Sequence, residues 1–134
     1  MTGKLKIWDG SDWIYVSQGA QGVAGTNGDT LLIVNDQTGT TYTLALTDAY
    51  HLVRCSNAAD IVVTIPTNGA VAFPIGSVII IEKYGAGNVK ISPDATVTVN
   101  SVDTCNTINF LYSAASLVKT ATNVWWLSGD LILT

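Results

Sequence analysis

The chain has 134 residues, a length that allows one core of ordinary size plus an appendage and argues against two full domains. Charged residues make up only 12% of it, and the net charge of −4 comes without any basic run, which argues against nucleic-acid binding because phosphate neutralisation needs clustered cations. The apolar runs are much shorter than the roughly 20 residues that span a bilayer, so we expect no integral membrane protein.

The first predicted element is a β-hairpin over residues 4–16. Two β-type runs, 4–8 and 12–16, flank the turn-forming segment 9–11, which reads Asp-Gly-Ser. An isolated hairpin is only marginally stable in water. Its aromatic side chains therefore need a surface to pack on, supplied by the rest of the fold or by a partner. These side chains are Trp8, Trp13 and Tyr15.

Glycine then recurs at every third position, at Gly19, Gly22, Gly25 and Gly28. This is the period of collagen, in which only glycine fits at the axis of three wound chains. The triplets contain no proline, so a short three-chain stem and a flexible Gly-rich linker stay open as alternatives. Either way, we predict an N-terminal hairpin over 1–18, a stem or linker over 19–29, and a C-terminal head over 30–134.

The head is predicted to be all-β, an antiparallel β-sandwich of the jelly-roll type. Short β-type runs separated by turn residues follow one another at a spacing of roughly ten residues, which is typical of sandwiches. Residues 78–81 are apolar on both faces of their strand, so one face could lie in the core and the other at a subunit interface. Residues 47–50 are expected to form at most one helical turn. The predicted strands are 31–34, 41–46, 51–55, 60–65, 77–83, 88–92, 95–100, 107–112, 116–120 and 123–127.

The sequence contains no catalytic motif. His51 is the only histidine and lies in an apolar run, so neither a His-based triad nor a multi-His metal site can be built. Cys55 and Cys105 lack CxxC spacing, and we expect two buried, reduced thiols, with a disulfide as the lesser alternative. The aspartates lie mostly beside turn residues, where solvated carboxylates are common. We therefore predict a protein that is not an enzyme and has no catalytic residue, cofactor or metal ion.

Trp125 and Trp126 are candidates for an interface of the head. Adjacent residues of a strand face opposite ways, so at most one of the two faces the core. The other meets solvent, another subunit or a ligand. Because tryptophan is enriched at protein interfaces, a subunit contact is favoured over a ligand.

Several segments resemble the C-terminal modules of bacteriophage fibre and head-decoration proteins. They are TYTLAL (41–46), LVRCS (52–56), VVTIP (62–66), FPIGS (73–77), GAGNVKISP (85–93), AASLVK (114–119) and WLSGDL (126–131). In addition, IWDGSDWIYV (7–16) is similar to the aromatic hairpin that precedes collagen-like stretches in such proteins. The resemblance implies a homotrimer of β-sandwich heads, joined through a stem and attached to a phage particle. The family has no shared catalytic residues to carry over.

Two virion roles are compatible with this resemblance. A tail fibre usually needs a long shaft, whereas this chain begins at Met1 with almost no shaft, so we expect a capsid decoration or cement protein that bridges neighbouring capsomers. Its partners would be itself and the major capsid protein, with Trp8, Trp13 and Tyr15 contacting the shell or neighbouring subunits. The alternative is a short tail fibre or receptor-binding tip that recognises a host-surface glycan. A bacterial β-sandwich enzyme or carbohydrate-binding module is least expected.

The expected location follows from the N-terminus. No apolar run comes after its basic residues, so we expect no secretory signal. Assembly in the cytoplasm of a bacterial host and a final place on the virion surface are then expected.

Overall fold

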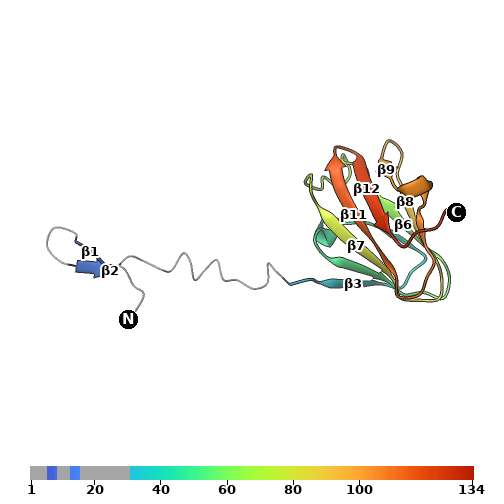
Figure 1. The fold of residues 1–134 in the computed structure, drawn as a ribbon, viewed down its shortest axis with the longest axis horizontal. Helices are drawn as coiled ribbons and strands as arrows, with labels where there is room; N and C mark the ends of the chain where they lie inside the picture. Colours follow the sequence, from blue (N-terminus) through green and yellow to red (C-terminus); the bar gives the residue numbers. More distant parts are fainter. Residues whose placement is uncertain (1–5, 9–12, 16–30) are drawn as a thin grey trace. The chain divides into compact units, whose positions relative to one another are not determined.

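The computed structural model describes residues 6–8, 13–15 and 31–134. The chain divides into two compact units, Met1–Leu31 and Leu32–Thr134. In the first unit, strand β1 (Lys6–Trp8) pairs antiparallel with β2 (Trp13–Tyr15), and Trp8 lies opposite Trp13 in the register (Figure 1). The predicted stem glycines lie outside the described residues, so the three-chain stem and the flexible linker both stay predictions.

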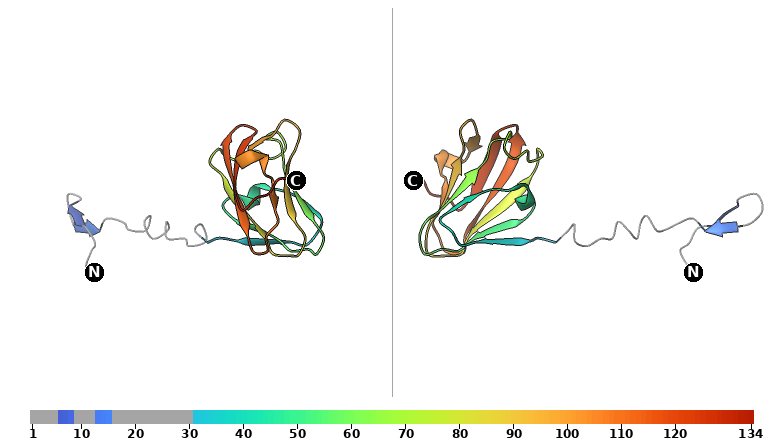
Figure 2. Two further views of the ribbon diagram at one scale, coloured as in Figure 1. Left: turned by 45° about the vertical axis from the view of Figure 1, so that its right-hand side comes forward. Right: turned by 180° about the vertical axis from the view of Figure 1, so that it is seen from behind.

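The second unit consists of two β-sheets that pack face to face, with almost no helix (Figures 1 and 2). The all-β prediction and its sandwich-like pair of sheets are thereby confirmed. The larger sheet has the order β3 (Val34–Gln37), β5 (Leu52–Cys55), β7 (Val78–Lys83), β11 (Ala114–Ala121), β12 (Val124–Gly129) and β9 (Thr98–Asn100). The smaller sheet has the order β10 (Thr107–Ile108), β8 (Val89–Pro93), β6 (Ile61–Ile65) and β4 (Thr41–Thr43).

The prediction of an antiparallel, jelly-roll-like sandwich is wrong in its strand directions. From β3 to β8 the chain alternates between the two sheets, so neighbours within a sheet are every second strand and run the same way. The pairs β3–β5, β5–β7, β4–β6 and β6–β8 are all parallel. Parallel neighbours need a crossover, and here a strand of the opposite sheet provides it. The result is a series of stacked coils, completed by the antiparallel pairs of β11 with β7 and β12.

The core lies between the two sheets and follows the period-two alternation of the strands. In β6, for example, Ile61, Val63 and Ile65 are buried, whereas the residues between them are partly exposed. Trp125 is fully buried and packs edge-to-face on Phe73, with 5.3 Å between ring centroids. The large apolar side chains of both inner faces thus form one continuous cluster.

Several predicted elements differ from the observed ones, and the predicted strands 41–46 and 95–100 are shorter, at Thr41–Thr43 and Thr98–Asn100. The first strand of the head begins at Val34 rather than at residue 31, because pairing with β5 starts there and runs on through polar residues. The predicted strand 107–112 ends at Ile108, since the chain then turns and Tyr112 adopts a positive φ of 64°. The expected helical turn is the 3-10 helix η2 (Leu46–Asp48), which begins one residue early; a second, η3, spans Val102–Thr104.

Two glycines allow the coils to stack closely. A Cβ atom at Gly85 would lie 2.3 Å from the carbonyl oxygen of Asn57, and one at Gly87 would lie 1.9 Å from that of Ala59. Both contacts are with backbone, which cannot rotate away. Glycine is therefore required at both positions for the loop after β7 to lie against the loop between β5 and β6.

Candidate interaction surface

The outer face of the larger sheet is apolar along its central strand. In β7, Ile79 and Ile81 are buried in the core, and Val78 and Ile80, which alternate with them, point to the opposite side. The register places Ile80 beside Leu52 of β5, and Val78 beside Val118 of β11. A sheet with one solvated face usually alternates apolar and polar residues, and β7 does not.

This apolar band continues toward both edges of the sheet. Val34 of the edge strand β3 lies opposite Leu52 and is 42% exposed. On the other side, Trp126 of β12 lies opposite Val118 and is 51% exposed. We call this band the outer apolar face. It consists of Val34, Leu52, Val78, Ile80, Val118 and Trp126.

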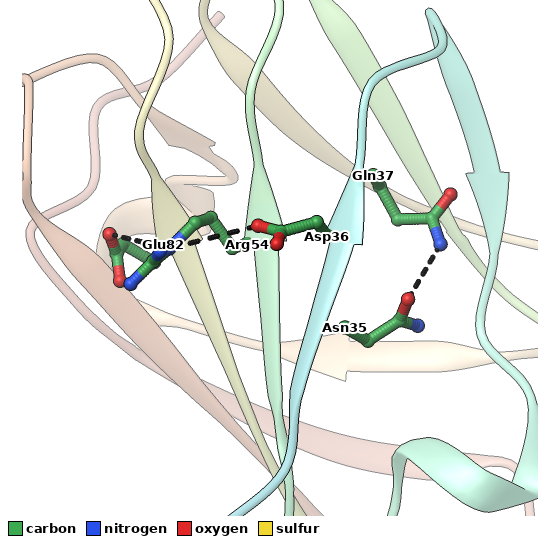
Figure 3. A network of polar contacts seen from close by, with 5 residues as sticks. All are labelled: Asn35, Asp36, Gln37, Arg54 and Glu82. Carbon is green, nitrogen blue, oxygen red and sulfur yellow. Dashed lines mark hydrogen bonds and ion pairs between the residues drawn. The ribbon is translucent and has the colours of Figure 1, made fainter.

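A row of charged residues borders the outer apolar face (Figure 3). Arg54 of β5 lies between Asp36 of β3 and Glu82 of β7, with its Nε 3.9 Å from the Asp36 Oδ1 and 3.5 Å from the Glu82 Oε1. The guanidinium carbon also lies 4.7 Å from the ring centroid of Tyr84, a cation–π distance. The Tyr84 ring contacts that of Tyr112 edge-on, at 5.7 Å. The positive charge of Arg54 is thus balanced by one of the two carboxylates, and the other carboxylate leaves the row with one net negative charge.

A buried carboxylate organises the other face of β3, to which Asn35 and Gln37 point. Asp48, in η2, is 1% exposed. Its Oδ1 accepts a hydrogen bond from the Asn35 side-chain amide at 2.8 Å, and its Oδ2 accepts from the Tyr42 hydroxyl at 2.7 Å and from the Ala45 N–H at 2.8 Å. Gln37 in turn donates to the Asn35 Oδ1 at 2.8 Å (Figure 3). Burial, followed by the hydrogen bond to Asp48, raises the pKa of Tyr42 to about 12.

A recess of about 440 Å³ opens next to this network. It is lined by Ile33, Val34, Asn35, Thr47, Asp48 and His51. The His51 Nδ1 accepts a hydrogen bond from the Ile33 N–H at 3.2 Å, which ties the segment before β3 to the head. The Asp48 carboxylate is 1% exposed and accepts three hydrogen bonds from residues of the fold, so its observed contacts are structural. The structure assigns His51 and Asp48 structural contacts.

Two lysines are almost fully buried, which the sequence did not indicate because lysine is rarely buried. Lys83 is 3% exposed and donates to the carbonyl oxygens of Gly85 and Ala86 at 2.9 and 3.1 Å. Lys119 is 2% exposed and donates to the Asn68 side chain at 2.5 Å and to the Phe73 carbonyl at 2.7 Å. Each ammonium group thus holds a loop against the end of the sandwich.

Both cysteines are free thiols, as expected. Cys55 is buried, and this burial, followed by the negative charge of Glu82, raises the pKa of its thiol to about 12. Cys105 is only partly buried, contrary to the expectation of two buried thiols, because it follows the exposed turn of η3.

The predicted contact residues fall into two groups. Trp8, Trp13 and Tyr15 belong to the β1–β2 hairpin, but their side chains lie outside what the structure describes. Of the head candidates, Trp125 is a core residue, and only Trp126 presents its side chain at the surface. The sequence indicated the outer apolar face through the two-sided apolarity of residues 78–81 and through the adjacent pair Trp125 and Trp126, one of which had to face outward.

The part of the chain that the structure describes contains no cluster of three or more histidine, cysteine or acidic residues able to hold a metal ion. Among the same residues, no helix has the length and apolarity needed to cross a membrane. Comparisons with protein-family models, with curated proteins and with solved structures found no match.

Proposed function

We propose that this chain is a structural protein of a bacteriophage particle, a homotrimeric decoration protein that bridges neighbouring capsomers on the outer shell. The observation that carries the proposal is the outer apolar face, an uncharged band across five of the six strands of the larger sheet, from β3 to β12, on the side away from the core. Monomeric proteins rarely expose large contiguous apolar patches, and patches of this kind mark interaction sites. The protein would assemble in the bacterial cytoplasm and remain on the virion surface.

The polar groups of the head support a role without catalysis. The buried carboxylate of Asp48 and the buried ammonium groups of Lys83 and Lys119 each hold backbone or side-chain partners of the fold. A general acid or base must reach a substrate with a free proton site, and these groups are already engaged. Their geometry therefore favours a scaffold over an active site.

The N-terminal hairpin is the proposed attachment element. In the register of its two described strands, β1 and β2, Trp8 lies opposite Trp13. Such a hairpin is marginal alone and gains stability by packing on a partner surface. Three hairpins on one trimer would bind the shell with avidity, since each bound arm raises the effective concentration of the others.

Capsid binding tests this proposal. Purified protein is mixed with capsids that lack it, and occupancy is measured by co-sedimentation, while light scattering gives the solution mass. We expect a mass near three times the 14.1 kDa of one chain, saturable binding, and loss of binding in the double variant Trp8→Ala/Trp13→Ala with the trimer intact. A wild-type monomer at all concentrations, or wild-type protein that does not bind, would reject the decoration role.

A receptor-binding tip for host glycans is the second candidate, favoured by one observation. Tyr84, Phe110 and Tyr112 are 45%, 59% and 68% exposed near one end of the larger sheet, and aromatic rings of this kind can stack on sugars. Glycan-array binding that is lost in Tyr112→Ala would support this function. Binding by neither wild-type nor variant protein would exclude it for the glycans on the array.

A further inference from the structure

We propose that Asn68 of the folded head converts to an acidic residue, whose carboxylate pairs with the buried ammonium group of Lys119. The conversion is a deamidation that needs only water. The Gly69 N–H gives its proton to solvent, its nitrogen bonds to the side-chain carbonyl carbon of Asn68, and the side-chain amide takes up a proton and leaves as ammonia. Water then opens the succinimide ring and leaves aspartate or isoaspartate. The change lies within the head and does not depend on the proposed place on a virion.

The charge of Lys119 lacks a counter-charge. Lys119 is 2% exposed, and its Nζ donates to the Asn68 Oδ1 at 2.5 Å and to the Phe73 carbonyl oxygen at 2.7 Å. Both acceptors are neutral. Among the described residues the ion pairs all involve Arg54, so no described carboxylate pairs with Lys119. A buried charge without a counter-charge is costly. A carboxylate at position 68 would supply the counter-charge at the atom that already contacts the ammonium group.

The fold does not require the glycine at position 69. Gly69 has no positive φ, and a Cβ atom there would have its nearest neighbour, the Thr67 Oγ1, 4.0 Å away. In this it differs from Gly85 and Gly87, where a Cβ atom would overlap backbone. Glycine costs the folded chain backbone entropy, so a glycine without a steric reason favours a chemical role. Without a side chain, its nitrogen can approach the Asn68 carbonyl carbon unhindered.

The hydrogen bonds around the turn leave the attacking nitrogen free and place a cation at the carbonyl group. The Asn68 N–H donates to the Asn123 Oδ1 at 2.7 Å, whereas the Gly69 N–H donates to no residue that the structure describes. Gly69 is exposed, so solvent reaches this nitrogen. Attack on the carbonyl carbon builds negative charge on the Asn68 Oδ1, the oxygen to which Lys119 already donates. A donor aimed at a developing oxyanion stabilises the transition state.

The new pair would fasten one connection of the head to its larger sheet. Lys119 belongs to β11, and Asn68 lies in the connection between β6 and β7. The same connection carries Phe73, the ring on which the buried Trp125 packs. Because both partners of the contact would then be charged, the hydrogen bond between them would be stronger than the present bond to an amide. The head would therefore gain stability after it has folded.

Conversion is tested on the full-length protein as a function of age. Freshly purified protein is incubated in mildly alkaline buffer beside a synthetic peptide of residues 64–72, and peptide-mapping mass spectrometry follows the change from amide to acid at Asn68. Gly69→Ala is the matched control, because its Cβ meets open space. We expect folded wild-type protein to convert at least as fast as the peptide, and Gly69→Ala to keep its amide over the same period. Circular dichroism checks folding.

The pairing is tested by thermal unfolding. Asn68→Asp should melt about 4 °C or more above fresh wild-type protein whose amide is intact, and Asn68→Ala should melt below it. An Asn68 that keeps its amide after the peptide has converted would overturn the conversion, as would equal conversion in Gly69→Ala. An Asn68→Asp protein that melts at or below the wild type would overturn the pairing with Lys119. If Gly69→Ala does not fold, the comparison with the peptide and the Asn68→Asp protein decide.

Discussion

Replacing Gly87 with alanine tests the stacking of the coils. The new Cβ would lie 1.9, 2.2 and 2.7 Å from three backbone atoms of Ala59 and Asp60, so these two loops must separate by about 1.5 Å to reach ordinary contact. Three hydrogen bonds cross this gap: Gly87 N–H to the Asn57 carbonyl at 2.9 Å, Ile61 N–H to the Asn88 carbonyl at 2.8 Å, and Asn88 N–H to the Asp60 carboxylate at 2.8 Å.

Losing these bonds, at about 1 kcal/mol each, lowers the free energy of unfolding by about 3 kcal/mol. For a domain of this size, that is a fall in melting temperature of about 12 °C or more. Thermal unfolding followed by circular dichroism measures it. Gly39→Ala is the control, because its nearest neighbour would be 3.7 Å away, and it should change stability by less than about 0.5 kcal/mol. A Gly87→Ala protein that melts with the control would refute the close backbone packing.

Three further predictions concern the interior. Asp48→Ala removes the acceptor of three buried hydrogen bonds and should lower the free energy of urea unfolding by about 3 kcal/mol, whereas Tyr42→Phe should cost about 1 kcal/mol; equal losses would contradict the central place of the carboxylate. The pKa values of Cys55 and Tyr42 are raised from 9.0 and 10.0 to about 12, so these two groups ionise at lower pH in the unfolded chain than in the folded one. The stability that the two neutral groups contribute is therefore complete below pH 9 and is lost as the pH rises to about 12. A urea midpoint that stays constant between about pH 8 and 11 would argue against this loss. Trp125→Ala should lower the free energy of unfolding by about 3–5 kcal/mol, as expected for a buried tryptophan. Trp126→Ala, measured under monomeric conditions, should lower it by less than about 1 kcal/mol. Similar losses in the two variants would mean that the two rings are not on opposite faces of the sheet.

Side-chain alternation made part of this fold predictable. The run Val78–Ile81 is apolar at every position, which indicated a strand with two apolar faces; in β7, Ile79 and Ile81 lie in the core, and Val78 and Ile80 lie in the outer apolar face. The adjacent tryptophans obey the same rule, since one is in the core and the other is at the surface. In both cases the information is local, because the strand period alone decides where each side chain points.

Neither the strand directions nor the buried polar groups could be predicted from side-chain alternation. The short loops rich in glycine and asparagine, such as residues 84–88, look like hairpin turns, but they lead the chain into the opposite sheet. Strand β3 was misplaced because hydropathy emphasises residues 31–34, whereas Asn35 and Gln37 enter a polar network that exists only once Asp48 is folded against them. Such partners are distant in sequence, and no local pattern encodes them.

The strand order also decides when the head can complete its fold as the chain leaves the ribosome. The coils from β3 to β8 can stack in the order of synthesis, because each new strand pairs with one already made. Strand β9 cannot, since its sheet neighbour is β12, the last strand of the chain. Until residues 124–129 emerge, β9 has no partner and the core lacks Trp125. Residues 124–129 are thus needed to complete the core, and chains truncated before them would expose an unfinished core to proteolysis.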